Sequence, residues 1–143
     1  MDLKYKTYID QFKDCESSNC TPIARNAFRW VFEDIKDSRN FLPRYLRNPD
    51  LKKTDPDCLG YALSMFDEAD QAKTRIAKIC KDKKLLYKVL GTHLGKGIIK
   101  IGDGISNESS TAKWNSGHFS FFEYINIDLS QSFIVVEKIE END

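Results

Sequence analysis

Two residues of this chain, Cys58 and His118, have the chemistry of a nucleophile and its base. Cys58 follows an Asp-Pro-Asp segment, and at a helix N-terminus its thiolate would be stabilised by the helix dipole and by free backbone N–H groups. His118 begins an alternating segment that predicts a strand, which would support the imidazole rigidly. A histidine close to a cysteine can remove the proton of the thiol. The pair predicts a thiol-dependent hydrolase of amide or acyl substrates, with its site centred on His118.

Short motifs around these two residues resemble those of papain-like peptidases and amidases. Asp57-Cys58-Leu59-Gly60 is similar to the Asp-Cys-Ser-Gly that opens a helix in such enzymes, and Gly117-His118 is similar to the Gly-His that begins a strand. Leu59 departs from this pattern, because those enzymes have a polar residue there. The competing interpretation is that Cys58 is a small buried residue and His118 a hydrogen-bonding residue at a strand end.

A second set of residues predicts nucleotide binding. Residues 58–66 fit a strand that contains Ser64, and residues 68–79 fit a helix that follows it. This order is similar to small ADP-ribosyltransferase-like folds, which combine an early Arg or His, a Ser on a strand in mid-chain and a late Glu or Gln. The resemblance implies that Arg29 clamps the diphosphate of NAD, that Ser64 supports the site, and that Glu123 holds a ribose hydroxyl.

A third hypothesis is a non-catalytic protein-binding module of the immunity, antitoxin or adaptor type. Trp114 lies in a polar loop before the His118 strand, and tryptophan is typical of the residues that contribute most to protein interfaces. In a purely structural role, Trp114 would cover the edge of the sheet. Polar residues converging on a concave pocket would favour an enzyme, whereas an exposed apolar patch without such a pocket would favour a binding module.

The composition is that of one folded domain, residues 1–143. The chain is 41% hydrophobic and 12% aromatic, and a chain of this length can bury one core. The 22 basic and 22 acidic residues cancel, so the net charge gives no electrostatic argument for a nucleic-acid partner. Residues 73–100 are mainly basic and residues 101–143 mainly acidic. We expect two solvated faces, and a basic strip that binds phosphate is the competing interpretation.

No segment of the chain predicts secretion or membrane insertion. The N-terminal residues lack the apolar run of a signal peptide, and no apolar window is long enough to span a bilayer. We therefore expect a cytoplasmic protein without a membrane partner, whose four cysteines are reduced thiols. Cys15 and Cys20 lack the second Cys or His pair that zinc requires, so we expect no metal site. The cofactor is unassigned, and the partner is a small molecule or a protein.

These patterns predict an α+β fold with a mainly antiparallel sheet of C-terminal strands, covered by two or three helices. Residues 118–125 place aromatic residues on both faces, which predicts a central strand buried on two sides. Residues 98–101 and 133–139 predict further strands, and Gly95-Lys96-Gly97 predicts a break. Residues 58–81 also fit one continuous helix, although we favour a strand followed by a helix.

The first sixty residues are less regular. Residues 1–20 predict a short amphipathic helix followed by a loop. Thr21-Pro22 is typical of a helix start, and we expect a short helix that runs into a strand at about residues 28–33. Residues 37–57 carry three prolines and predict an irregular segment, and such long loops are often functional.

Overall fold

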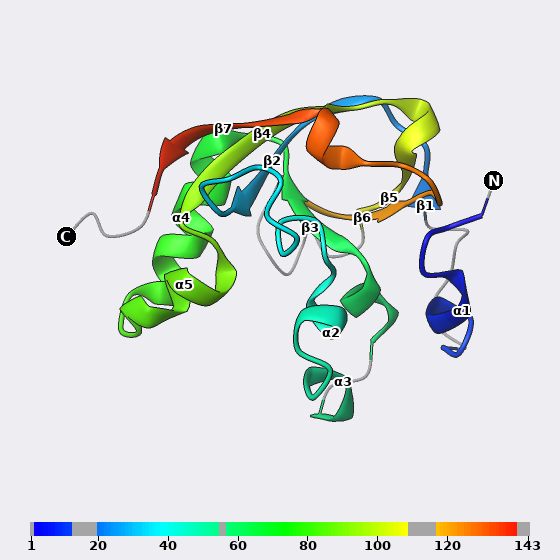
Figure 1. The fold of residues 1–143 in the computed structure, drawn as a ribbon, viewed down its shortest axis with the longest axis horizontal. Helices are drawn as coiled ribbons and strands as arrows, with labels where there is room; N and C mark the ends of the chain where they lie inside the picture. The colour runs from blue at the N-terminus through cyan, green and yellow to red at the C-terminus, as the bar shows by residue number, and fades with distance from the viewer. Residues whose placement is uncertain (1, 13–19, 55–56, 109–116, 140–143) are drawn as a thin grey trace.

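A single antiparallel sheet is the centre of the structure. The computed structural model describes residues 2–12, 20–54, 57–108 and 117–139 (Figure 1). Within these ranges seven strands form one sheet in the order β1-β5-β6-β3-β2-β4-β7, and each neighbouring pair is antiparallel. The strands are β1 Cys20–Thr21, β2 Arg25–Val31, β3 Leu63–Phe66, β4 His93–Ile99, β5 Gly104–Asn107, β6 His118–Glu123 and β7 Phe133–Lys138.

Short helices connect these strands. In the described ranges the α-helices are α1 Lys6–Ile9, α2 Arg44–Arg47, α3 Leu51–Thr54, α4 Ala69–Cys80 and α5 Tyr87–Leu90, and single 3-10 turns are η2 Cys58–Tyr61, η3 Lys84–Leu86, η4 Ile101–Asp103 and η5 Leu129–Gln131. Figure 1 shows α4 and α5 together on one side of the structure and α1 at the opposite end, near β1. No helix in the described part of the chain combines the length and the hydropathy that a bilayer span requires.

The fold is mixed α+β, as predicted, but its sheet is not built from C-terminal strands alone. Strands β1, β2 and β3 precede residue 67, and β2 and β3 lie between β6 and β4 in the sheet. The prediction missed this arrangement because most residues of β2 lie where the chain fits a helix as well as a strand. Long-range pairing with β4 along all of β2 resolves the ambiguity in favour of the strand.

Apolar side chains cover both faces of the sheet. On one face, Met65 and Phe119 belong to a buried cluster that also includes Leu129 from η5. On the other face, Phe66 packs with Ala72 and other residues of α4. The alternation of Met65 and Phe66 between the two clusters explains why this segment forms a strand. All six residues of β6 are buried, which confirms the predicted strand buried on two sides.

The segment from η2 to α4 agrees with prediction in part, because residues 58–61 of the predicted strand form η2 and the strand begins only at Leu63. A strand, β3, is followed by the helix α4, which has twelve residues, so a continuous helix over residues 58–81 is wrong. Trp30 in β2 fastens this helix to the sheet, because its Nε1 donates a hydrogen bond of 2.8 Å to the carbonyl of Ala72. The helix therefore has both an apolar contact and a polar contact with the sheet.

The predicted break at Gly95-Lys96-Gly97 is wrong, because β4 runs through both glycines. A Cβ atom at Gly97 would lie 2.5 Å from Cδ1 of Phe133, and one at Gly95 would lie 3.1 Å from Cγ1 of Val31. Each glycine thus makes room for a large side chain of a neighbouring strand rather than ending its own strand.

The N-terminal predictions hold only in part. The helix expected in residues 1–20 is confined to the four residues of α1. Thr21 belongs to β1 rather than to a helix start. The irregular segment of residues 37–57 contains α2 and α3, and Tyr45 anchors it, since its hydroxyl accepts a hydrogen bond of 2.9 Å from the Asp57 amide.

Candidate functional site

Cys58 lies in η2 and is buried. Asp57 caps this turn, because its carboxylate accepts a hydrogen bond of 3.0 Å from the amide of Leu59. Cys58 is disulfide-bonded, so in this state it has no thiol to act as a nucleophile, and the expectation of four reduced cysteines is wrong for this residue. Its role as a nucleophile stays a prediction for the reduced protein. Among the remaining cysteines, Cys20 and Cys80 are thiols that take part in no disulfide, and Cys15 lies outside the described residues.

His118 begins β6 and is 2% exposed. Burial lowers its pKa to about 4, and the positive charge of Arg75 lowers it further, so the imidazole is neutral at pH 7. Its partner in the neighbouring strand is Phe66, at the C-terminal end of β3. Cys58 precedes the opposite end of that strand, beyond Leu63. The structure therefore does not bring Cys58 and His118 together.

Arg29 projects from β2 and is also buried, with 6% exposure. Its Nε donates a hydrogen bond of 2.8 Å to the carbonyl of Asn40, and its Nη1 donates one of 2.7 Å to the carbonyl of Ser64. Burial lowers the pKa of Arg29 to about 9, and the charge of Arg47 acts in the same direction. The guanidinium is still charged at pH 7, and it joins the segment after β2 to strand β3.

Ser64 contacts both Arg29 and His118, two predicted site residues that belong to different functional hypotheses. Its carbonyl oxygen accepts the hydrogen bond from Arg29, and its hydroxyl oxygen lies 3.1 Å from Nε2 of His118. The structure thus brings Arg29, Ser64 and His118 into one hydrogen-bonded chain across β2, β3 and β6. Sequence reasoning did not link these three residues, since strand pairing alone makes them neighbours.

Glu123 ends β6 and is 3% exposed. Its Oε2 lies 3.1 Å from Nζ of Lys4, and apart from Lys4 neither carboxylate oxygen has a hydrogen-bond partner among the described residues. Burial raises the pKa of Glu123, and the charges of Lys4 and Arg29 oppose that rise. The carboxylate also contributes, after burial, to raising the pKa of Tyr5 to about 12. Glu123 therefore holds the N-terminal segment against β6.

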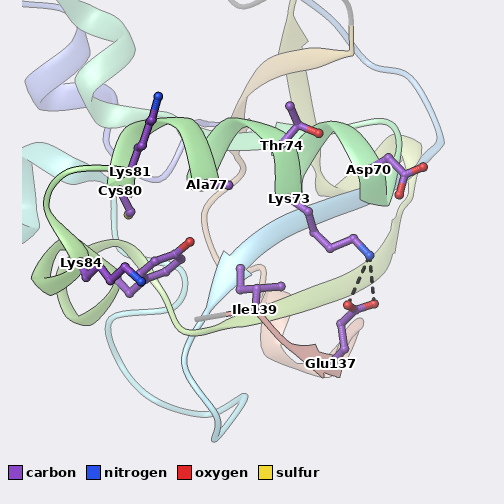
Figure 2. A pocket seen from close by; sticks show the side chains of 10 residues that line it. Asp70, Lys73, Thr74, Ala77, Cys80, Lys81, Lys84, Glu137 and Ile139 are labelled. Atoms are coloured by element: carbon purple, nitrogen blue, oxygen red, sulfur yellow. Dashed lines mark hydrogen bonds and ion pairs between the residues drawn. The ribbon is translucent and has the colours of Figure 1, made fainter. Parts of the chain in front are cut away.

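A cleft of about 700 Å³ lies beside α4, and none of the five predicted site residues lines it. Figure 2 shows an ion pair at one side of this cleft, in which Nζ of Lys73 lies 3.3 Å from Oε1 of Glu137. Lys84 lies on the other side, and Ile139 lies between them. The predicted basic segment supplies its lysines, but nothing in the sequence indicated the cleft. The lining residues are Asp70, Lys73, Thr74, Ala77, Cys80, Lys81, Lys84, Tyr87, Glu137 and Ile139.

A second hollow, of about 470 Å³, lies over strands β4 and β7. Two apolar residues of its lining, Ile98 and Ile134, are 60% and 63% exposed, and Val136, further along β7, is 42% exposed. We call these three side chains, together with the outer edge of β7, the edge surface. The run of apolar residues in the last predicted strand could have indicated it, since successive side chains point to opposite faces of a sheet and an antiparallel sheet can leave one face exposed. The hollow is lined by Lys96, Gly97, Ile98, Lys100, Gln131, Ser132 and Ile134.

Two further predictions concern Trp114 and metal binding. Trp114, the predicted interface residue, lies outside the described residues. Within the described ranges, no three His, Cys, Asp or Glu side chains come together as metal ligands would. No family model matches this chain, and neither the curated proteins nor the solved structures include a significant match to it.

Proposed function

We propose that this chain is a non-catalytic protein-binding module and that a partner protein docks on the edge surface. The observation that carries the proposal is the position of three exposed apolar side chains, Ile98, Ile134 and Val136, on the last two strands of the sheet. Ile134 lies opposite Lys96 in β4, and Ile98 follows Lys96 at the strand period of two, so Ile98 and Ile134 share one face. Burying two such side chains against a partner contributes about 1.5–3 kcal/mol each.

The buried predicted residues support a binding module over an enzyme. Arg29, His118 and Glu123 are all nearly inaccessible. Nε and Nη1 of Arg29 each donate a hydrogen bond to a backbone carbonyl of the protein itself. A substrate would have to displace these internal contacts before it reached the side chains. An exposed apolar patch needs no such rearrangement to bind a partner.

The edge surface suits a partner that adds an extended segment to the sheet. Strand β7 is the last strand of the described sheet, so its outer backbone N–H and C=O groups can pair with a strand of another chain. Backbone hydrogen bonds provide affinity in this mode of recognition, and pockets for alternate side chains provide specificity. The hollow beside Ile98 and Ile134 is the corresponding pocket here.

A peptide selection tests the proposal. We would select binders from a random peptide display library on the wild-type protein and measure them against the variant Ile134→Lys. We expect apolar, strand-forming peptides whose affinity falls at least about tenfold in the variant, which corresponds to 1.4 kcal/mol. Leu85→Lys is the matched control, because Leu85 is an exposed apolar residue of η3. Peptides that bind both variants equally, or that shift only NMR signals of α4, would contradict docking on the edge surface.

A further inference from the structure

The segment that follows α4 has apolar side chains on two sides. Leu86, Tyr87 and Leu90 pack against the buried cluster that joins α4 to the sheet. Leu85 and Val89 lie outside this contact, with exposed fractions of 75% and 57%. Leu85 is the most exposed large apolar side chain in the part of the chain that the structure describes. One apolar side of the segment is therefore covered by the core, and the other faces solvent.

Leu85 and Val89 belong to one face of this segment. The turn η3 and the helix α5 follow each other without a gap, and residues four apart on a helical surface are neighbours. Arg47 of α2 holds this face in place, because its Nη2 donates a hydrogen bond to the carbonyl of Val89. Single exposed apolar residues are ordinary on protein surfaces, whereas neighbouring ones indicate a contact with another molecule.

Lysines surround the two exposed apolar side chains. Residues 81–89 contain four lysines, at positions 81, 83, 84 and 88, against one acid, Asp82, and all five of these residues are exposed. Lys81, Lys83 and Lys88 form no ion pair within the described residues. The positive charge of this segment is therefore available to a partner. We call residues 81–89 the basic turn.

We infer that the basic turn docks on the surface of an anionic lipid bilayer. Its lysines attract the negatively charged headgroups, and Leu85 and Val89 enter the boundary between headgroups and acyl chains. The inference goes beyond the proposed function, because the basic turn shares no residue with the edge surface. The expectation of no membrane partner rested on the lack of a spanning segment, which contact with a bilayer surface does not require.

The exposed aliphatic pair favours a bilayer over other anionic partners. A nucleic acid would use the lysines but leave Leu85 and Val89 in water, because it is bound through charged, polar and aromatic groups. Neither side chain lines one of the two hollows described above, and Figure 1 shows α5 and the turn after α4 at the periphery of the structure, below the strands. A protruding apolar tip needs a partner that can surround it, as the fluid surface layer of a bilayer can.

Co-sedimentation with vesicles tests the charge. We expect the wild type to bind vesicles with about 30% phosphatidylserine at about 0.1 M salt, and to bind neutral phosphatidylcholine vesicles far less. Lys83→Glu combined with Lys88→Glu should weaken binding about twentyfold or more, because each lysine near an anionic surface contributes about fivefold. The control is Lys36→Glu combined with Lys96→Glu, which changes the net charge equally at two other exposed lysines. It should bind within about twofold of the wild type.

The same assay tests the apolar contact. Leu85→Ser combined with Val89→Ser should weaken binding to the anionic vesicles about tenfold. Ile98→Ser combined with Ile101→Ser is the matched control, since these two side chains are 60% and 61% exposed and lie outside the basic turn. This control should bind as the wild type does. Circular dichroism of each variant checks that it is folded.

Fluorescence tests insertion directly. In Leu85→Trp, the emission in excess of the wild-type signal should shift to the blue on addition of anionic vesicles, and brominated lipids should quench it, because the indole enters the headgroup boundary. In Ile101→Trp, the corresponding emission should stay unchanged, since Ile101 is a comparably exposed residue of η4.

The outcomes decide the inference independently of the proposed function. A wild type that does not bind anionic vesicles overturns it, and so does binding that the Leu85 and Val89 double variant retains in full. Binding of single-stranded DNA that is lost in the lysine variant, without vesicle binding, would assign the basic turn to nucleic acid. Vesicle binding that both double variants lose, together with the shift in Leu85→Trp, supports it. Peptide binding through Ile134 is a separate measurement that none of these results changes.

Discussion

Nε2 of His118 lies 3.1 Å from the hydroxyl oxygen of Ser64, inside the sheet. Because burial lowers the pKa of His118 to about 4, the neutral imidazole is the form that the folded protein accommodates. This contact explains how a histidine is tolerated between apolar neighbours, and it makes the stability of the fold dependent on pH.

We predict that the protein loses stability as the pH falls from about 6.5 toward 4. The unfolded chain protonates His118 near its ordinary pKa of 6.5, whereas the folded chain protonates it only near 4. The unfolded state therefore binds more protons in this window, and the expected loss is roughly 3 kcal/mol. Urea unfolding at pH 7 and pH 4 measures it. The variant His118→Gln should lose less stability over this range than the wild type does, and an equal loss in the two proteins would contradict the prediction.

We predict that Arg29 acts as a structural residue. The variant Arg29→Met leaves the carbonyls of Asn40 and Ser64 without their buried donor, which we expect to lower the free energy of unfolding by about 2–5 kcal/mol. Arg39→Met is the control, since the Arg39 side chain is half exposed, and it should cost less than about 1 kcal/mol. Chemical denaturation measures both variants.

The ADP-ribosyltransferase-like hypothesis is tested with the same residue. We expect isothermal titration calorimetry to detect no binding of NAD, because Arg29 already bonds two backbone carbonyls. NAD binding by the wild type that is lost in Arg29→Lys would contradict this expectation and favour nucleotide recognition. The conservative variant retains the charge and removes only the bidentate geometry of the guanidinium.

Alkylation tests the thiol-hydrolase hypothesis. Without reductant, Cys58 should not react with iodoacetamide, because it is disulfide-bonded. Cys20 and Cys80 should react slowly at neutral pH, since burial raises the pKa of both thiols. Mass spectrometry reports each cysteine separately. Rapid reaction of Cys58 near pH 6 after mild reduction, abolished by His118→Ala, would instead indicate a thiolate paired with that histidine.

Glycine substitutions test the packing across β4. Gly97→Ala should lower stability by about 1–3 kcal/mol, because its Cβ would lie 2.5 Å from the ring of Phe133. The control is Gly102→Ala, since a Cβ there meets nothing within 4 Å, and its effect should stay within about 0.5 kcal/mol. Thermal unfolding of both variants measures these changes in stability. An equal effect at the two positions would show that close packing against Phe133 does not restrict Gly97.

Local sequence patterns predicted two kinds of element: those with one apolar and one polar face, and those with two apolar faces. The alternation of residues 118–125 was enough to predict β6 and its burial, and acidic residues before residue 69 with basic residues near residue 80 marked the ends of α4. The same patterns failed at Gly95 and Gly97, where local propensity favours a turn. The facing side chains of Val31 and Phe133 decide that conformation, and they are distant in the sequence.

For the candidate site, the sequence by itself determined which residue types were available, and the tertiary structure decided which of them meet. Arg29, Ser64 and His118 are up to 89 positions apart and become neighbours only because β2, β3 and β6 pair. Cys58 and His118 form the more obvious chemical pair, yet they lie toward opposite ends of β3. The edge surface likewise depends on tertiary structure, since Ile98 and Ile134 come to share one face only through the pairing of β4 with β7. Strand order and register arise from long-range pairing, which a local sequence pattern does not specify.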